Sequence, residues 1–274
     1  MKKTWLILAL VFGFGSGVAG LDNSRSRIPN AKEVAELLAV ICAGSRIKTE
    51  NSSCSPCPEK VGDGNTDAMK LETVLYGHFL NAKETNAIID VSGCEPHANN
   101  YGGTLVLRWK GLTRWQFVRY EAGARSNDCL KYAARVGRDQ GRDLRVCRQY
   151  YSQMGFTVET FGLFDDTLEP PQQTYSNRDL VTMTSNSGQC SDPKLNEFEV
   201  LGVERRNLNR DGRLDLRLRV SERHAQLSKG AECNETPVWG AVKTLTLEFL
   251  FDGATFKATP ATKPIVKYLE GFKA

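Results

Sequence analysis

Two segments with alternating apolar and polar residues, 104–109 (TLVLRW) and 115–120 (WQFVRY), are separated by only five residues, KGLTR. A period of two residues is typical of a strand with one buried face, and so short a connection joins neighbouring antiparallel strands. Pairing about the centre of the connection sets Leu107 opposite Phe117 and Trp109 opposite Trp115. Because cross-strand apolar pairs stabilise a sheet, this stretch predicts an antiparallel hairpin of defined register.

The same pattern recurs towards the C-terminus. Residues 245–251 (LTLEFLF) run into the turn dipeptide Asp252-Gly253 and on to Phe256, which predicts a second hairpin. After about residue 70 no helical periodicity is evident, so we expect a mainly β fold of antiparallel hairpins. The other predicted strands cover residues 129–136, 143–148, 156–164, 179–184 and 198–203, and residues 164–178 are expected to form a loop.

One helix is predicted before this β region. Residues 31–43 (AKEVAELLAVICA) place apolar side chains at helical spacing, with Asn30 as the N-cap and Gly44 as the stop. The following residues are rich in Ser, Asn, Pro and Gly and are expected to be irregular. We therefore divide the mature chain into a helix with a cysteine-containing connector (21–66) and a mainly β domain (67–274).

The N-terminus has the features of a secretory signal peptide. Lys2 and Lys3 precede an apolar run from Trp5 to Gly15, and small residues follow at 16–20. This order predicts a signal peptide over residues 1–20, cleaved after Ala19 or Gly20. The apolar run is shorter than the roughly 20 residues of a membrane-spanning helix. We expect a secreted or periplasmic protein with no transmembrane anchor after cleavage.

Composition and motifs argue against several functional classes. Without the two leader lysines, 34 basic residues face 32 acidic ones, which is too balanced to favour nucleic-acid binding. The mature chain contains neither H-E-x-x-H nor G-x-S-x-G, and His78, His97 and His224 lie far apart in sequence. The sequence thus favours a non-catalytic protein.

Eight cysteines follow the predicted leader, and an even number in an exported chain predicts disulfides. Cys129 and Cys147 are equidistant from residue 138, so pairing about that turn places them opposite one another and predicts a bond between them. A long-range bond between Cys190 and Cys233 is expected next. The cysteines left to join the helix and connector to the sheet, with their pairing open, are Cys42, Cys54, Cys57 and Cys94.

A candidate calcium loop spans residues 207–215 (NLNRDGRLD). Calcium takes several oxygen ligands from a tightly turned loop, and Gly212 permits such a turn. An EF-hand would continue as a helix, but residues 214–220 alternate as a strand does. The alternative is a plain Asp-Gly turn before a strand. The expected ligands are side-chain oxygens of Asn207, Asn209, Asp211 and Asp215 and the backbone carbonyl of Arg213.

This loop-then-strand pattern resembles the FG-GAP (VCBS-type) repeat of integrin-like β-propellers, best over residues 207–220. A degenerate copy covers residues 77–89, where the ligand positions hold His78, Leu80, Ala82 and Asn86 and no carboxylate remains. The resemblance implies blade-like β elements, an exported location and interaction roles. The fold expected is therefore β-propeller-like or a sandwich.

These observations favour an exported binding or structural module with one weak calcium loop and an unidentified protein or glycan partner. One alternative is a glycan hydrolase that uses the loop carboxylates Asp165, Asp166 and Glu169. Another is a thiol–disulfide oxidoreductase, because Cys54 and Cys57 have C-x-x-C spacing.

Overall fold

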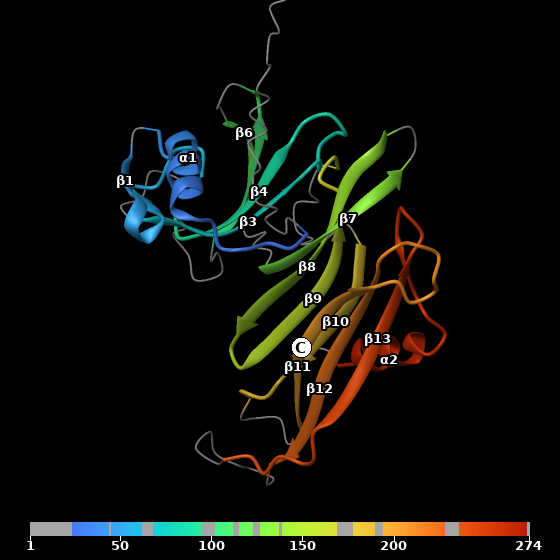
Figure 1. Ribbon diagram of the computed structural model, residues 1–274. Coiled ribbons are helices and arrows are strands. Elements are labelled where there is room, and N and C mark those ends of the chain that lie inside the picture. Colours follow the sequence, from blue (N-terminus) through green and yellow to red (C-terminus); the bar gives the residue numbers. More distant parts are fainter. Residues whose placement is uncertain are drawn as a thin grey trace, which may run out of the picture.

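A computed structural model describes residues 24–43, 45–61, 68–94, 102–111, 115–122, 127–136, 139–168, 178–189, 194–227 and 236–272. The predicted signal peptide and Gly44 lie outside these ranges. The described chain is mainly β and its sheets are antiparallel throughout, as the sequence predicts (Figure 1). The helical elements are α1 (Ala31–Ile41), the 3₁₀ turn η1 (Thr49–Asn51) and α2 (Thr262–Leu269). The strands are β1 (Arg46–Lys48), β2 (Ser53–Ser55), β3 (Met69–Gly77), β4 (Asn86–Ser92), β5 (Gly103–Trp109), β6 (Trp115–Ala122), β7 (Asn127–Val136), β8 (Asp139–Gln153), β9 (Phe156–Phe164), β10 (Arg178–Ser185), β11 (Lys194–Arg206), β12 (Asp215–Gln226), β13 (Lys243–Phe251) and β14 (Phe256–Ala258).

The N-terminal half is a six-stranded sheet in the order β1-β2-β3-β4-β5-β6. Helix α1 covers one face of it with the buried side chains Val34, Leu37, Leu38 and Ile41. Asn30 caps the helix as predicted, because its side chain accepts from the Glu33 amide while the Glu33 carboxylate accepts from the Asn30 amide. The predicted connector is more regular than expected, since its strands β1 and β2 belong to this sheet. The sheet therefore contains residues from both sides of the proposed domain boundary at residue 66.

The β5–β6 hairpin has the predicted register. Leu107 pairs with Phe117 and Trp109 with Trp115, and the two indole rings meet edge-on at 5.1 Å. The β13–β14 hairpin is likewise confirmed, with Phe251 opposite Phe256. In both cases a short connection and an alternating pattern leave only one register that buries the apolar side chains.

The C-terminal half consists of two four-stranded sheets, β10-β9-β8-β7 and β11-β12-β13-β14, which curl around one core like half a barrel (Figure 1). Leu216, Leu218 and Val220 of β12 are fully buried in this core. Helix α2 packs against β10 and β13 and contributes the buried Leu269. Helix α2 was not expected in this mainly β region. It is only eight residues long, although its apolar residues Ile265, Val266 and Leu269 have helical spacing and face the core.

Three disulfides occur among the described residues, joining Cys42 to Cys54, Cys57 to Cys94 and Cys129 to Cys147. The last is the bond predicted from the hairpin, and the first two join the helix and connector to the sheet. Cys190 and Cys233 lie outside the described residues. Disulfides are typical of an oxidising, extracytoplasmic compartment. Neither described helix has the length and apolar character that crossing a bilayer requires.

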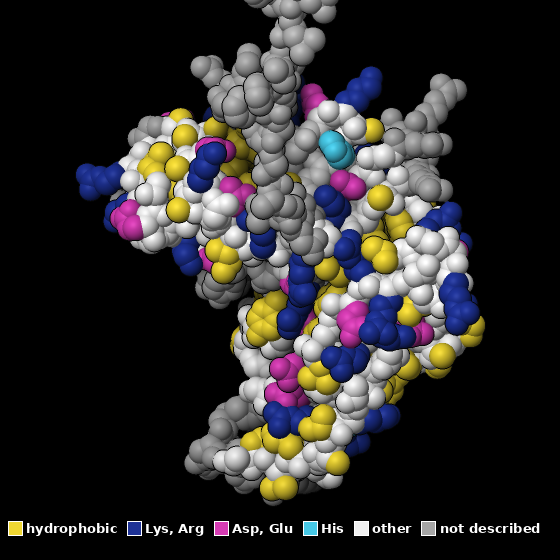
Figure 2. Space-filling view, viewed as in Figure 1, with side chains coloured by type: hydrophobic (Ala, Val, Ile, Leu, Met, Phe, Trp, Pro, Cys, Tyr) yellow, Lys and Arg dark blue, Asp and Glu magenta, His cyan; other side chains and the backbone are white. Residues whose placement is uncertain are grey.

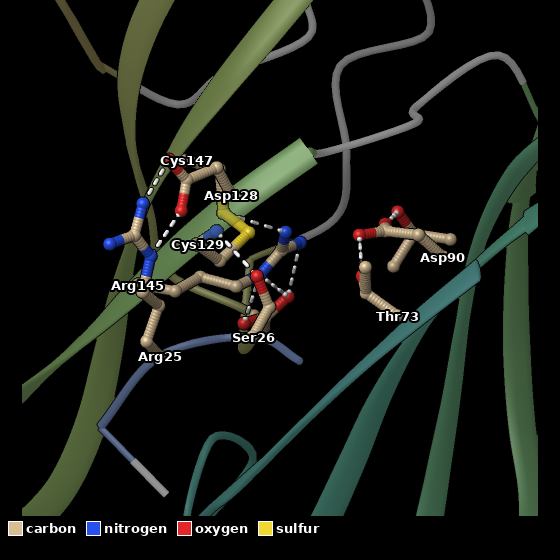
Figure 3. Close-up of a disulfide and its surroundings, with 10 residues drawn as sticks. Arg25, Ser26, Thr73, Asp90, Asp128, Cys129, Arg145 and Cys147 are labelled. Carbon is tan, nitrogen blue, oxygen red and sulfur yellow. Dashed lines mark hydrogen bonds and ion pairs between the residues drawn. A yellow bond between two sulfur atoms is a disulfide. The ribbon is translucent and has the colours of Figure 1, made fainter. Parts of the chain in front are cut away.

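Residues 24–27, which we call the N-terminal strap, join the two halves. Ser26 donates its amide proton to the Cys129 carbonyl in β7 and accepts one from the Cys129 amide through Oγ, both at 2.8 Å (Figure 3). Arg27 exchanges two backbone hydrogen bonds with Val74 of β3. Within the strap, Arg25 forms a two-bonded ion pair with Asp128 of β7 at 2.5 Å. The strap thus connects β3 of one half to β7 of the other.

Candidate functional site

The predicted calcium loop lies on the surface between β11 and β12, and Asp215 is the first residue of β12. Arg210 and Gly212 have positive φ, 63° and 85°, which gives the tight turn. Asn209 accepts a hydrogen bond from the Asp211 amide, and Asp211 accepts one from the Arg213 amide. The Arg213 amide bond is the main reason why the pKa of Asp211 lies below its ordinary value.

Asp215 has a structural role that the sequence did not reveal. Its side chain is fully buried, with Oδ2 accepting from the Leu208 amide and Oδ1 from the Phe251 amide, both at 2.8 Å. Asp215 therefore fastens the loop to the neighbouring strand β13. Asn207, Asn209 and Asp211 are exposed, and no group of three or more His, Cys, Asp or Glu suited to a metal occurs among the described residues.

The degenerate copy at 77–89 is also a loop followed by a strand, since β3 ends at Gly77 and β4 begins at Asn86. Asn86 occupies the position that matches Asp215. It too is fully buried, and its Oδ1 accepts a hydrogen bond from the Leu80 amide at 2.9 Å. His78 and Ala82 lie in the loop that Asn86 closes.

The carboxylates proposed for glycan hydrolysis are paired with arginines. Asp165 receives hydrogen bonds from Arg142, and the buried Asp166 from Arg145 at 2.9 Å. Burial alone would raise the pKa of Asp165, but the bonds from Arg142 and Thr167 outweigh it and hold that pKa below its ordinary value. A glycosidase acid needs a raised pKa, so Asp165 is unsuited to that role. Glu169 lies outside the described residues.

The C-x-x-C pair is not a redox pair in this structure. Cys54 bonds to Cys42 and Cys57 bonds to Cys94, whereas a thiol–disulfide oxidoreductase requires the two cysteines of the motif to bond to each other. Both cysteines therefore have the structural role expected of them, which is to join the helix and connector to the sheet.

The sequence did not predict a pocket of about 750 Å³ in the C-terminal half. It lies where β10 and β12 end, β11 begins and the last described residues return to the sheet. Hydrophobic side chains gather on the surface at the lower end of this half in Figure 2. The walls of the pocket combine amide, imidazole and apolar groups. They are contributed by Thr184, Asn186, Lys194, Leu195, Asn196, His224, Ala225, Gln226, Val238, Gly240, Gly271 and Phe272.

A buried carboxylate supports one wall of this pocket. Glu222, in β12, accepts a hydrogen bond from the Tyr268 hydroxyl of α2, and its Oε1 lies 2.6 Å from His224 Nε2. Burial would raise the pKa of Glu222, but these two hydrogen bonds outweigh it and lower that pKa. Burial, with help from Glu222, raises the pKa of Tyr268 to about 12. The carboxylate is thus ionised at neutral pH and orients the histidine at the pocket.

Part of this arrangement is readable from the sequence. Residues two apart in a strand face the same way, so Glu222 and His224 are expected on one side of β12. Tyr268 lies in a short helix that was not predicted, and Phe272 follows the end of that helix, so the rest of the pocket could not be anticipated.

No family model, curated protein or solved structure matches this chain.

Proposed function

We propose that the chain is an exported, non-catalytic binding module whose ligand site is the pocket beside Glu222, His224 and Tyr268. The observation that carries the proposal is the pocket itself. It combines apolar walls with a few polar groups held in position, which is the usual composition of a small-ligand site. The disulfides agree with export, and the ligand is a free small molecule or an exposed part of a protein or glycan partner, in the periplasm or outside the cell.

The pocket can be tested by filling it. A Cβ added at Gly240 would meet only the His224 carbonyl oxygen within 4 Å, at 3.3 Å, so Gly240→Trp places a large side chain at the pocket at the cost of a backbone shift of a few tenths of an ångström. We expect a mixed screen of small sugars, amino acids and organic acids, followed by NMR, to give saturable shifts in the unmodified chain and none in Gly240→Trp. Chemical turnover of any bound compound would contradict a non-catalytic role.

We further propose that the loop at 207–215 binds calcium weakly, as an FG-GAP-like loop. Supporting this, the side chains of Asn207, Asn209 and Asp211 are exposed at a turn that their own hydrogen bonds shape. Asp211 supplies the exposed carboxylate, because the oxygens of the buried Asp215 accept backbone amides, so we expect a Kd at the weak end of roughly 10⁻⁴ to 10⁻³ M. About 10 mM calcium would then stabilise the fold by roughly 1.4 kcal/mol, a rise of about 3–6 °C in Tm.

The matched control for this loop is Asp252, which accepts amide hydrogen bonds from Ala254 and Thr255 in a similar turn without the ligand pattern. Asp211→Ala is expected to abolish the calcium response of the Tm, and Asp252→Ala to retain it. If calcium leaves the Tm of the unmodified chain unchanged, the loop is only a turn.

A further inference from the structure

The pocket presents a hydrogen-bond acceptor from His224. Because the Glu222 carboxylate is an acceptor only, His224 must donate its Nε2 proton to it, and a neutral imidazole then carries a lone pair on Nδ1. The His224 side chain is 48 % exposed and lines the pocket. Tyr268 donates to the same carboxylate, so its hydroxyl proton is already used.

Asn196 presents a second acceptor. Its Nδ2 donates to the Thr184 carbonyl at 2.6 Å, and its backbone amide donates to Asn186 Oδ1 at 2.7 Å. The Nδ2 bond fixes the orientation of the side-chain amide group, and the backbone bond holds this part of β11 beside Asn186. Within the described part of the chain nothing donates to Asn196 Oδ1, so this oxygen remains as its acceptor at the pocket wall.

An aromatic wall completes the site. The Phe272 ring packs against Phe198 at 5.2 Å and Tyr268 at 5.1 Å, and it lies nearly parallel to the His224 ring, with 6.1 Å between centroids. It is therefore held in place by three neighbours. Among the described residues that line the pocket, Lys194 is the charged one and no carboxylate occurs.

We propose that this pocket binds a single neutral saccharide residue, free or at the end of a glycan. A sugar ring has an apolar C–H face to pack on Phe272 and hydroxyl groups that can donate to His224 Nδ1 and Asn196 Oδ1. A wholly apolar ligand would leave both acceptors desolvated and unpaired, which is unfavourable. The inference rests on the proposed binding function and specifies its ligand class.

The test is an NMR titration of the ¹⁵N-labelled mature chain with methyl glucoside, methyl galactoside and N-acetylglucosamine. Glucuronate serves as the anionic probe and cyclohexanol as the apolar ring. We expect saturable shifts of the Gly240 and Gly271 amides with at least one neutral sugar, and weaker binding of both comparison probes. Phe272→Ala and His224→Phe should each weaken sugar binding by about tenfold or more.

His78→Gln is the matched control, since His78 lies in the loop between β3 and β4 in the other half of the molecule, and it should leave the affinity unchanged. Because His224→Phe also removes a partner of Glu222, Phe272→Ala provides an independent test. Tighter binding of cyclohexanol would overturn the saccharide assignment, and tighter binding of glucuronate would overturn the neutral charge of the ligand; either result would preserve the binding function. Sugar binding that persists in Gly240→Trp would overturn it by placing the sugar elsewhere. If neither these probes nor the mixed screen bind at the pocket, both proposals fail.

Discussion

Arg145 and Asp166 lie opposite one another at the junction of the two halves, with side chains that are 1 % and 2 % exposed. Arg145 also lies over the Phe164 ring at 4.3 Å, so it has no route to solvent. Asp166→Asn would remove the charge of the carboxylate that pairs most closely with this buried guanidinium. We expect it to lower the free energy of unfolding in urea by about 3–5 kcal/mol.

The control for that variant replaces both partners. Arg145→Met with Asp166→Leu removes the charges together, and an apolar pair of similar volume often matches a buried ion pair. The double variant should therefore be clearly more stable than Asp166→Asn. If the two variants unfold at the same urea concentration, the unpaired charge is not the cause of the loss.

Glu222 gives the second residue-scale prediction, and it depends on pH. Because the folded-state pKa of Glu222 lies below its ordinary value of 4.5, its contribution is present above that pH and is lost as the pH falls through the folded pKa. Glu222→Gln should cost roughly 1–3 kcal/mol at pH 7 and flatten the fall in stability below pH 4.5. Urea unfolding at a series of pH values measures both effects.

The surface carboxylate Glu204 serves as the comparison, since its side chain is 35 % exposed and its partners lie on the surface. Glu204→Gln should change stability by about 0–1 kcal/mol and leave the acid limb unaltered. An acid limb in Glu222→Gln identical to that of the unmodified chain would contradict the assignment.

At the scale of elements, the β7–β8 hairpin joins local pattern to a covalent bond. The Cys129–Cys147 disulfide spans 18 residues. Replacing both cysteines by alanine should lower the free energy of unfolding by about 3 kcal/mol in the chain-entropy account. Denaturant unfolding under non-reducing conditions measures the loss. Reducing the unmodified chain would also break the Cys42–Cys54 and Cys57–Cys94 disulfides. The double variant is therefore the comparison that isolates the contribution of Cys129–Cys147.

Elements whose partners are close in sequence were the ones that could be predicted. The β5–β6 register follows from a five-residue connection, and the cap of α1 from Asn30 and Glu33 at capping-box spacing. Helix α2 escaped prediction because it is only eight residues long and contains Pro264, although Ile265, Val266 and Leu269 have helical spacing. A proline in the first turn is nevertheless compatible with a helix, since the amide that it lacks has no partner there.

The candidate pocket could not be predicted for a related reason. Its wall residues come from β10, β11, β12, the segment before β13 and the C-terminal residues, and no local pattern relates them. The calcium loop, by contrast, is a local motif, but the sequence did not show that Asp215 hydrogen-bonds to the amide of Phe251, 36 residues away. Pairwise contacts over such separations depend on how the sheets curl.

At the scale of the whole molecule, the N-terminal strap determines how firmly the halves are joined. A chain beginning at Ile28 would lose four backbone hydrogen bonds to β3 and β7, or roughly 2–6 kcal/mol. We expect the amides of Val74 and Lys131 to exchange hydrogen faster in this shortened chain. Arg25→Ala keeps the strap backbone and should cost about 0–1 kcal/mol, because its ion pair is half exposed. Unchanged exchange at both amides would show that the strap is dispensable.

The strap also bears on the order in which the protein reaches its final state. A chain grows from its N-terminus, so residues 24–27 are made long before Cys129, which follows Ser26 by 103 positions. Closing so long a loop is entropically costly and slow compared with forming a local hairpin. The β3–β4 and β5–β6 hairpins can therefore form while the strap is still unpaired. Although the strap is synthesised before these hairpins, it is among the last segments to form its native hydrogen bonds.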